Sequence, residues 1–193
     1  HHIPSQRLKD SKDKGLIEAT NDFSKVSILD VVIICVPTPL NAHREPDLGC
    51  VHATMQSITT YLKKGQIISL QSTTYPGTTE EEIKPYLVNA GLVVGENIFL
   101  IYSPEREDPG NVNYDTATIP KLIGGITSKC TDVGYELYKS VIKEVIKTSS
   151  TREAEMAKLL ENIHRAVNIG LMNELKILCD HMDIDLFEVI RAA

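Results

Sequence analysis

The chain has 193 residues, with 20 basic against 26 acidic side chains and a net charge of −6. The acidic balance and the lack of a basic run argue against nucleic acid or an acidic membrane surface as a partner, and the longest apolar runs are too short to cross a bilayer. The four cysteines have no metal-ligand spacing, so we expect no metal site and a reducing, cytoplasmic setting without disulfides. Cys35 and Cys179 lie in apolar contexts and are predicted to be buried.

The first half of the chain predicts a strand–helix–strand unit. Residues 1–29 are polar and predict a helix over 5–14 and a short strand at 17–20. The β-branched run at 30–36 is typical of a strand buried on both faces of a parallel sheet. Apolar residues then recur every three or four positions over 47–63, which predicts a helix, and a second strand follows over 66–70.

The second half continues this alternation. A helix is predicted over 79–90, a strand over 97–102, a short strand over 121–125, a helix over 130–141 and a strand over 144–147. A long helix covers 151–182, and Asp185 is predicted to cap a last helix over 186–192, with Glu188 at its third position. Strands alternating with helices predict an α/β fold with a parallel sheet and right-handed connections.

Polar groups gather in two places where a ligand is expected. Three predicted strands are followed by polar segments: Pro37-Thr38-Pro39, Ser72-Thr73-Thr74 and Ser103-Pro104-Glu105. Ligands bind at the carboxyl ends of the strands in such sheets. On the long helix, one face carries four polar residues: Glu155, Lys158, Asn162 and Arg165. The Lys and the Asn, one turn apart beside an apolar seam, suit stabilisation of a negative charge, although a solvated helix face has the same spacing.

Five segments, taken in order, resemble the UDP-glucose/GDP-mannose dehydrogenase family. They are VPTPLNAHREPDL from residue 36, STTYPGTTEEEI from 72, SPEREDPGN from 103, IPKLIGG from 119 and EAEMAKLLENIHRAVNIGLMNEL from 153. The third segment looks most like the branch that oxidises UDP-N-acetylglucosamine at C6 in capsule and O-antigen pathways. The branches acting on UDP-N-acetylmannosamine or UDP-glucose are the alternatives.

The resemblance implies a fold, a cofactor and partners. Residues 1–150 would form the second half of a Rossmann-like NAD-binding domain, and residues 151–193 the start of a central helical dimerisation region. The cofactor would be NAD, the substrate a UDP-sugar, and the long helix would join two copies of the chain. The family's glycine-rich G-x-G-x-x-G turn and its catalytic Cys in a G-x-G-G-H-C context are not in this sequence. We therefore expect an interior fragment that is inactive as it stands.

The resemblance also implies roles for individual residues. Thr73 would position a catalytic water near the nicotinamide, Glu105 would act as general base, and Lys158 and Asn162 would stabilise an oxyanion. The side of the site that binds the cofactor, called the cofactor side below, would be lined by Val36, Pro37, Thr38 and Thr73.

Two residues and one function class are left open. Glu107 matches a second, nicotinamide-side glutamate, or else pairs with Arg106 or is a solvated loop charge. Arg165 is expected to pair with Glu161, or to face the substrate or the dimer partner. As an alternative to an enzyme, the chain would be a non-catalytic association module, using the apolar stripe of its long helix: Leu160, Val167, Leu171, Leu175 and Leu178.

Overall fold

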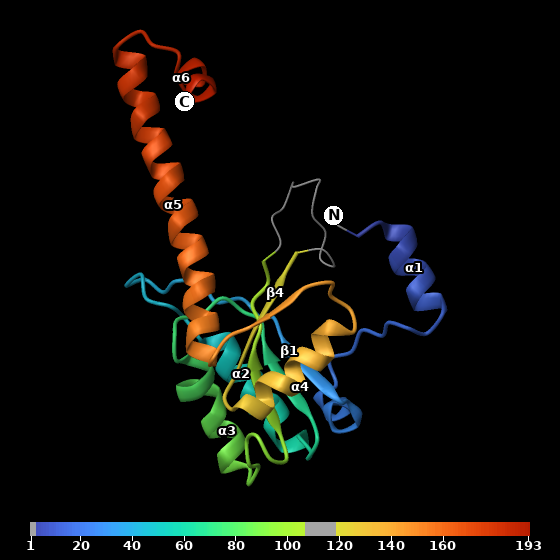
Figure 1. Ribbon diagram of the computed structural model, residues 1–193. Helices are drawn as coiled ribbons and strands as arrows, with labels where there is room; N and C mark the ends of the chain where they lie inside the picture. The colour runs from blue at the N-terminus through green and yellow to red at the C-terminus, as the bar shows by residue number, and fades with distance from the viewer. Residues whose placement is uncertain (1–2, 107–118) are drawn as a thin grey trace.

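The computed structural model describes residues 3–106 and 119–193 as a five-stranded sheet with helices on both faces (Figure 1). The strands are β1 (Val31–Ile34), β2 (Ile67–Leu70), β3 (Phe99–Tyr102), β4 (Lys121–Gly125) and β5 (Val145–Lys147). The α-helices are α1 (Ser5–Asp13), α2 (Gly49–Ile58), α3 (Lys84–Asn89), α4 (Ser128–Lys139), α5 (Thr151–His181) and α6 (Leu186–Ala192). Three short helices complete the set: the 3₁₀-helices η1 (Phe23–Ile28) and η2 (Thr59–Tyr61), and the π-helix η3 (Thr79–Ile83).

The sheet is parallel except at one pair of strands. Its order is β1-β2-β3-β4-β5, and β1, β2 and β3 run parallel, as predicted. β4 instead runs antiparallel to β3, with Tyr102 opposite Gly124, and β5 runs parallel to β4. The sequence between β3 and β4 has no helical pattern, and without a crossover helix a strand returns antiparallel to its neighbour. The predicted all-parallel sheet is therefore wrong at this pair.

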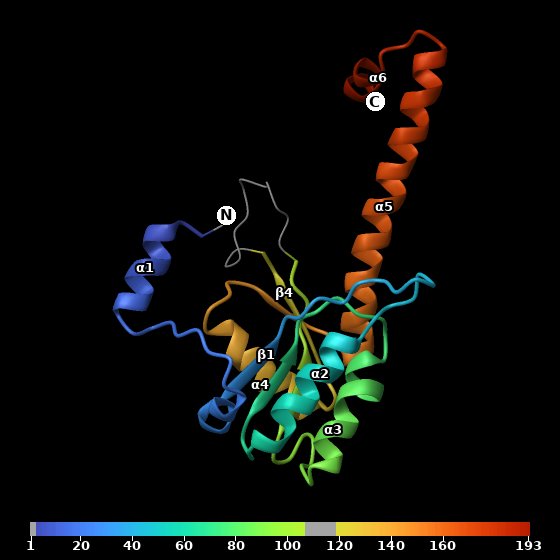
Figure 2. The same cartoon turned by 180° about the vertical axis from the view of Figure 1, so that it is seen from behind.

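Two hydrophobic cores lie on the two faces of the sheet. Helices α2 and α3 and the first turns of α5 cover one face, and α4 covers the other (Figures 1 and 2). Neighbouring side chains of a strand point to opposite faces: Leu100 and Tyr102 belong to the first core, and Ile101 belongs to the second. On the α4 side, Ile101 packs in one cluster with Cys130 and Tyr138.

β1 lies at an edge of the sheet. The prediction that this strand is buried on both faces is therefore wrong. Ile33 is 46% exposed, and the thiol-bearing Cys35 that follows the strand is exposed as well. A run of β-branched residues is the same in an edge strand as in a central one, so the pattern could not separate them. Residues 17–20 form no strand, and all four cysteines are free thiols.

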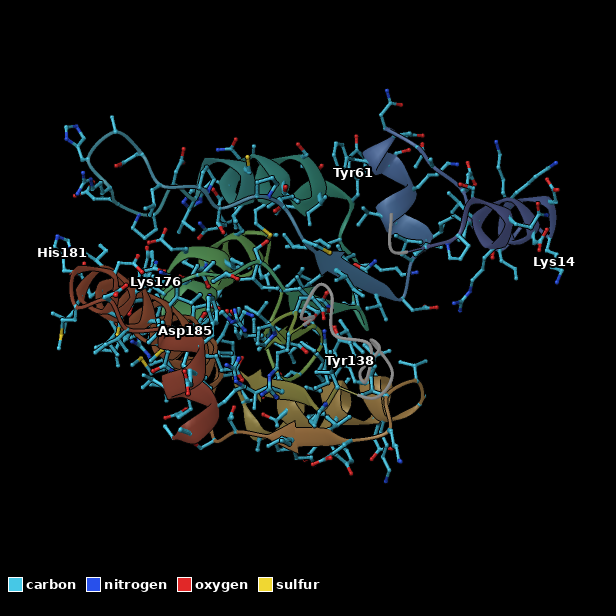
Figure 3. The ribbon with its side chains drawn as sticks, turned by 90° about the horizontal axis from the view of Figure 1, so that it is seen from above. Lys14, Tyr61, Tyr138, Lys176, His181 and Asp185 are labelled. Carbon is cyan, nitrogen blue, oxygen red and sulfur yellow. The ribbon has the colours of Figure 1, made fainter. Side chains whose placement is uncertain are left out.

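α5 begins against the sheet and then projects away from it. Its buried residues, Thr151, Ala154 and Glu155, all lie in the first two turns. The far part of the helix, with Lys176 and His181, lies on the opposite side of the molecule from Lys14 near α1 (Figure 3). Cys179 is half-buried. No helix in the described part of the chain is long and apolar enough to cross a membrane.

The predicted cap of the last helix is present. The side chain of Asp185 accepts a hydrogen bond from the backbone nitrogen of Phe187 at 2.9 Å, at the start of α6. This bond satisfies one of the amide groups that a helix start leaves without a partner.

The glycine pair at the end of β4 allows close packing on both faces of the sheet. A Cβ added at Gly124 would lie 2.1 Å from the carbonyl oxygen of Ser150, which precedes α5. A Cβ added at Gly125 would lie 2.3 Å from the backbone nitrogen of Thr131 in α4. Both distances are far below van der Waals contact, so only glycine lets α5 and α4 approach β4 this closely.

Candidate functional site

The ends of β1 and β2 are tied together by two side-chain hydrogen bonds. Thr38 Oγ1 donates to the carbonyl oxygen of Thr73 at 2.6 Å, and Ser72 Oγ donates to the carbonyl oxygen of Val36 at 2.7 Å. Thr73 and Pro37 are exposed, whereas Val36 and Thr38 are half-buried. The structure thus brings the four described residues of the predicted cofactor side together, at an accessible edge of the sheet.

Glu155 anchors α5 to the loop after β2. Its carboxylate is fully buried and accepts three hydrogen bonds, from the backbone nitrogens of Gly77 (2.6 Å) and Thr79 (2.8 Å) and from Thr79 Oγ1 (2.7 Å). Burial raises the pKa of Glu155 because the charged form loses water, although the hydrogen bonds act in the opposite direction. Through these bonds the loop that carries Thr73 is fixed against the first turns of α5.

Lys158 and Asn162 lie one turn apart on α5, and both are half-buried. Burial is the main cause that lowers the pKa of Lys158, because the protonated form loses solvation. Four charged side chains lie near enough to influence this pKa as well: Glu161 and Glu105 raise it, and Arg165 and Arg106 lower it. The ion pair between Arg106 and Glu161, one turn after Lys158, brings this part of α5 to the segment that follows β3.

Glu105 is held by a buried lysine. Glu105 Oε2 lies 3.1 Å from Nζ of Lys121, whose exposed fraction is only 7%. The same ammonium lies 5.4 Å from the ring centroid of Tyr138 on α4. Lys121 reaches Glu105 because β4 is antiparallel to β3, so the first residue of β4 lies at the edge where β3 ends.

Arg106 connects the segment after β3 to α5. Its Nη2 forms an ion pair with Glu161, and its Nη1 donates to the carbonyl oxygen of Pro120 at 3.0 Å. Glu161 is therefore the partner of Arg106, and the predicted pair between Arg165 and Glu161 is absent from the described part of the chain. Glu107, the other residue predicted for the cofactor side, lies outside the described residues.

The sequence reasoning did not identify Lys121 or the partner of Glu155. The only signal for Lys121 was a charged side chain at the first position of an apolar strand. Glu155 was grouped with Lys158 on the polar face of the helix, and nothing in the spacing indicated a partner 76 residues away. Among residues 3–106 and 119–193, no group of three or more His, Cys, Asp and Glu side chains is arranged to hold a metal ion.

Comparison with known proteins identifies the family. The NAD binding domain of the UDP-glucose/GDP-mannose dehydrogenase family matches residues 2–142, and the central domain of that family matches residues 152–193. Protein CapL of Staphylococcus aureus is 38% identical over 100% of the chain, and a UDP-N-acetyl-D-glucosamine 6-dehydrogenase of Pseudomonas aeruginosa is 37% identical over 99%. The chain covers 45% of each of these two relatives, so it spans less than half their length.

A solved structure agrees with this comparison. The UDP-D-ManNAc dehydrogenase of Pyrococcus horikoshii superposes with a TM-score of 0.91 at 31% identity, over 100% of this chain and 47% of that one. The Rossmann-like α/β fold expected from the sequence is confirmed by this likeness. The chain belongs to the UDP-glucose/GDP-mannose dehydrogenase family.

Proposed function

We propose that the chain carries part of the site for NAD-dependent oxidation of a UDP-N-acetylhexosamine at its C6 hydroxyl. Within that class, we propose UDP-N-acetylglucosamine as the substrate. The product would be the uronic acid used in capsule or O-antigen precursors, formed in the cytoplasm. The carrying observation is that the ion pair between Arg106 and Glu161 ties α5 to the segment after β3, while Glu155 fixes the same helix to the loop after Thr73. The segment over 103–111 favours UDP-N-acetylglucosamine, with UDP-N-acetylmannosamine and UDP-glucose as alternatives.

The reaction defines what the side chains must do. Oxidation of a primary alcohol to a carboxylate consumes one water and two NAD⁺, and it releases two NADH and three protons. A hydride leaves C6 readily only as the hydroxyl loses its proton, so a base must stand beside it. Glu105 fits this role because its carboxylate is held in place by Lys121 while its side chain remains partly exposed.

Lys158 and Asn162 would stabilise the negative charge that develops on the C6 oxygen. An ammonium and an amide donor on one rigid helical face need little reorganisation when that charge forms. Lys158 is half-buried, so its charge acts in a partly dehydrated place, where electrostatic interactions are stronger than in water. Thr73, whose hydroxyl can donate and accept, would position the water that the reaction consumes.

The residues at the ends of β1 and β2 fit the nicotinamide end of NAD. Exposed Pro37 and half-buried Val36 supply an apolar surface, and the hydroxyls of Thr38 and Thr73 add polar groups beside it. A flat ring with an amide substituent suits such a surface, and NAD would supply the hydride acceptor when bound. We propose that Val36, Pro37, Thr38 and Thr73 line this part of the site, together with Glu107.

We propose that these 193 residues do not complete the reaction alone. The second oxidation in this family uses a cysteine nucleophile, and none of the four cysteines lies in the G-x-G-G-H-C context. In the described residues, no glycine-rich turn at a helix start is placed to hold the diphosphate of NAD. Both groups would have to come from other residues of the whole protein.

We also propose that α5 joins two copies of the chain. Leu160, Val167, Leu171 and Leu178 are all more than half exposed along the projecting helix. A matching stripe on a second copy would cover them about a two-fold axis. Leu175, predicted to belong to this stripe, is half-buried within the single chain. The alternative function, that of a non-catalytic association module, would use the same apolar surface.

Calorimetry and NADH absorbance together test the proposed enzyme. The chain has no Trp, so its binding of NAD and of the three UDP-sugars is best followed by calorimetric titration. We expect saturable binding of NAD, tighter binding of UDP-N-acetylglucosamine than of the other two sugars, and no NADH. Equal affinity for all three sugars would contradict the assignment of substrate. Failure to bind any of them would favour the association module.

NADH production by the chain alone would contradict the proposal that it is inactive. In that case Lys158→Met should lower the rate by about a hundredfold, the typical effect of removing one oxyanion donor. Lys176→Met is the matched control, because Lys176 lies on the same helix but pairs with Asp180, far along the projecting part.

A further inference from the structure

A buried polar network lies on the face of the sheet that α4 covers. Ser69 in β2 and Gln71 just after that strand both reach the phenol of Tyr138 on α4. The hydroxyl oxygen of Tyr138 lies 2.8 Å from Oγ of Ser69, and it accepts a hydrogen bond from Nε2 of Gln71, also at 2.8 Å. Ser69 is fully buried, and Tyr138 is 6% exposed. Two hydrogen bonds therefore fix the orientation of this ring inside the core.

Lys121 lies between this ring and the segment after β3. It is two residues before Ile123, which belongs to the core on the α4 face, so its side chain leaves β4 on that face. Its ammonium is 5.4 Å from the ring centroid of Tyr138 and 3.1 Å from Oε2 of Glu105. An ammonium that is taken out of water needs other groups to replace the lost solvation. The ring and the carboxylate both contribute to that replacement.

The two partners of the ammonium act differently. The face of the ring attracts the cation through its quadrupole, whereas the carboxylate offers oxygen lone pairs to the N–H groups. The ring therefore sets where the ammonium lies, and the N–H groups point to Glu105. The other oxygen of Glu105, Oε1, accepts a hydrogen bond from the backbone nitrogen of Arg106 at 3.0 Å. The carboxylate is held at both oxygens, and its orientation depends on Lys121.

We propose that Tyr138 is a positioning residue for the oxidation and acts on Glu105 through Lys121. The inference rests on the proposed function, in which Glu105 is the base that takes the proton of the C6 hydroxyl. A base must lie within hydrogen-bond reach of that proton, and a small displacement of its supporting groups is enough to lose the productive geometry. Through this chain of contacts α4 takes part in the site from the opposite face of the sheet to α5.

NMR signals of the two charged side chains test the inference. The ¹⁵N signal of the Lys121 ammonium is assigned by its disappearance in Lys121→Met, and the ¹³C signal of the Glu105 carboxyl by its disappearance in Glu105→Gln. We expect Tyr138→Leu, which removes the ring, to expose the ammonium to exchange with water and broaden its signal beyond detection, and to shift the carboxyl signal. Tyr138→Phe keeps the ring and most of its volume but loses both hydrogen bonds, so it should shift both signals by a smaller amount.

Tyr135→Leu is the matched control. Tyr135 lies on the same helix, and its ring has cations of its own: the ammonium of Lys139 at 5.2 Å and that of Lys147 at 4.3 Å. The substitution removes contacts of the same kind from α4, so the Lys121 and Glu105 signals should stay as they are in the parent chain. Amide spectra of each variant, compared with the parent spectrum, show whether the fold is intact.

Binding of the sugar nucleotide separates a positioning role from a merely structural one. Titration with UDP-N-acetylglucosamine should move the carboxyl signal of Glu105 in the parent chain, because the base lies beside the bound C6 hydroxyl. Tyr138→Phe should bind the sugar nucleotide with unchanged affinity, since Tyr138 lies on the far face of the sheet. The response of the carboxyl signal to the bound sugar should nevertheless be much smaller in this variant.

The outcomes distinguish this inference from the proposed function. Unchanged Lys121 and Glu105 signals in the Tyr138 variants would overturn the inference, as would an undiminished carboxyl response in Tyr138→Phe. If Tyr138→Leu does not fold, Tyr138→Phe decides by the same signals. If the parent chain binds no UDP-sugar, the proposed function fails, while shifted signals in Tyr138→Phe still show that Tyr138 holds the carboxylate through Lys121.

Discussion

Glu155 offers the sharpest test of how α5 is attached to the rest of the fold, through the loop that follows β2. Glu155→Ala removes a fully buried carboxylate and leaves three donors without an acceptor: two backbone N–H groups and the hydroxyl of Thr79. Each unsatisfied buried donor costs about 1–3 kcal/mol. Water entering the vacated space would satisfy some of them, so we expect a loss of about 3–5 kcal/mol in the free energy of unfolding.

Urea denaturation followed by circular dichroism measures this loss. For a chain of this size, 1 kcal/mol corresponds to about 2–4 °C in the melting temperature, so heating should give a concordant fall of roughly 6–20 °C. Glu174→Ala is the matched control, because Glu174 is exposed on the same helix, and it should change stability by less than about 0.5 kcal/mol. A loss of under 1 kcal/mol in Glu155→Ala would refute the anchoring role.

The pH dependence of the Glu155 contribution has a definite sign. Burial raises the pKa of Glu155 in the folded chain, so folding favours the protonated form. The stabilisation from this group is therefore fully present below the ordinary glutamate pKa of about 4.3 and is lost as the pH rises through the raised value. The stability difference between the parent chain and Glu155→Gln should shift in favour of Glu155→Gln as the pH increases. A shift in the opposite direction would mean that the hydrogen bonds outweigh burial.

Four further substitutions test separate parts of the structure. Gly124→Ala should destabilise the chain by about 1–3 kcal/mol or more in urea denaturation, because its Cβ would overlap the carbonyl oxygen of Ser150; Gly170→Ala, with open space around its Cβ, should instead stabilise α5 by up to about 1 kcal/mol. Lys121→Met should cost about 1–2 kcal/mol in the same assay, since Glu105 is partly exposed and regains water; a cost near zero would show that the pair is not formed. Leu171→Asp should abolish self-association in sedimentation experiments if α5 joins two copies, and sedimentation of the parent chain as a monomer would contradict the proposed dimer.

The elements of the fold were predictable because their signals are local. Apolar runs and helical periodicities gave every strand of the sheet and every α-helix to within a few residues. The direction of β4 was predicted wrongly. Strands and helices alternate along the chain except between β3 and β4, where the sequence predicts no helix, and the prediction of a parallel sheet did not allow for this exception. The edge position of β1 was misjudged because exposure depends on neighbouring strands, which the run over 30–36 does not encode. Residues 17–20 have too little apolar pattern to pair with any strand.

The candidate site was predictable only where a motif marked it. The motif residues Thr73, Glu105 and Lys158 were picked out by resemblance, and the structure connects the elements that carry them. The groups that hold them were not predictable, because a hydrogen bond between Glu155 and Thr79 depends on the packing of α5 across the sheet. The same holds for the ion pair between Arg106 and Glu161, since an arginine on the neighbouring turn of α5 offered a nearer partner in the sequence.

The most direct measurement maps ligand binding on the described residues. Amide chemical shifts of the ¹⁵N-labelled chain are recorded during titration with NAD and then with UDP-N-acetylglucosamine. The account predicts that NAD perturbs Val36, Thr38 and Thr73, and that the sugar nucleotide perturbs Lys158, Asn162 and Arg165 on one face of α5. Perturbations confined to other surfaces, or shifts at α5 from NAD alone, would contradict a site built at the meeting point of the strand ends and the long helix.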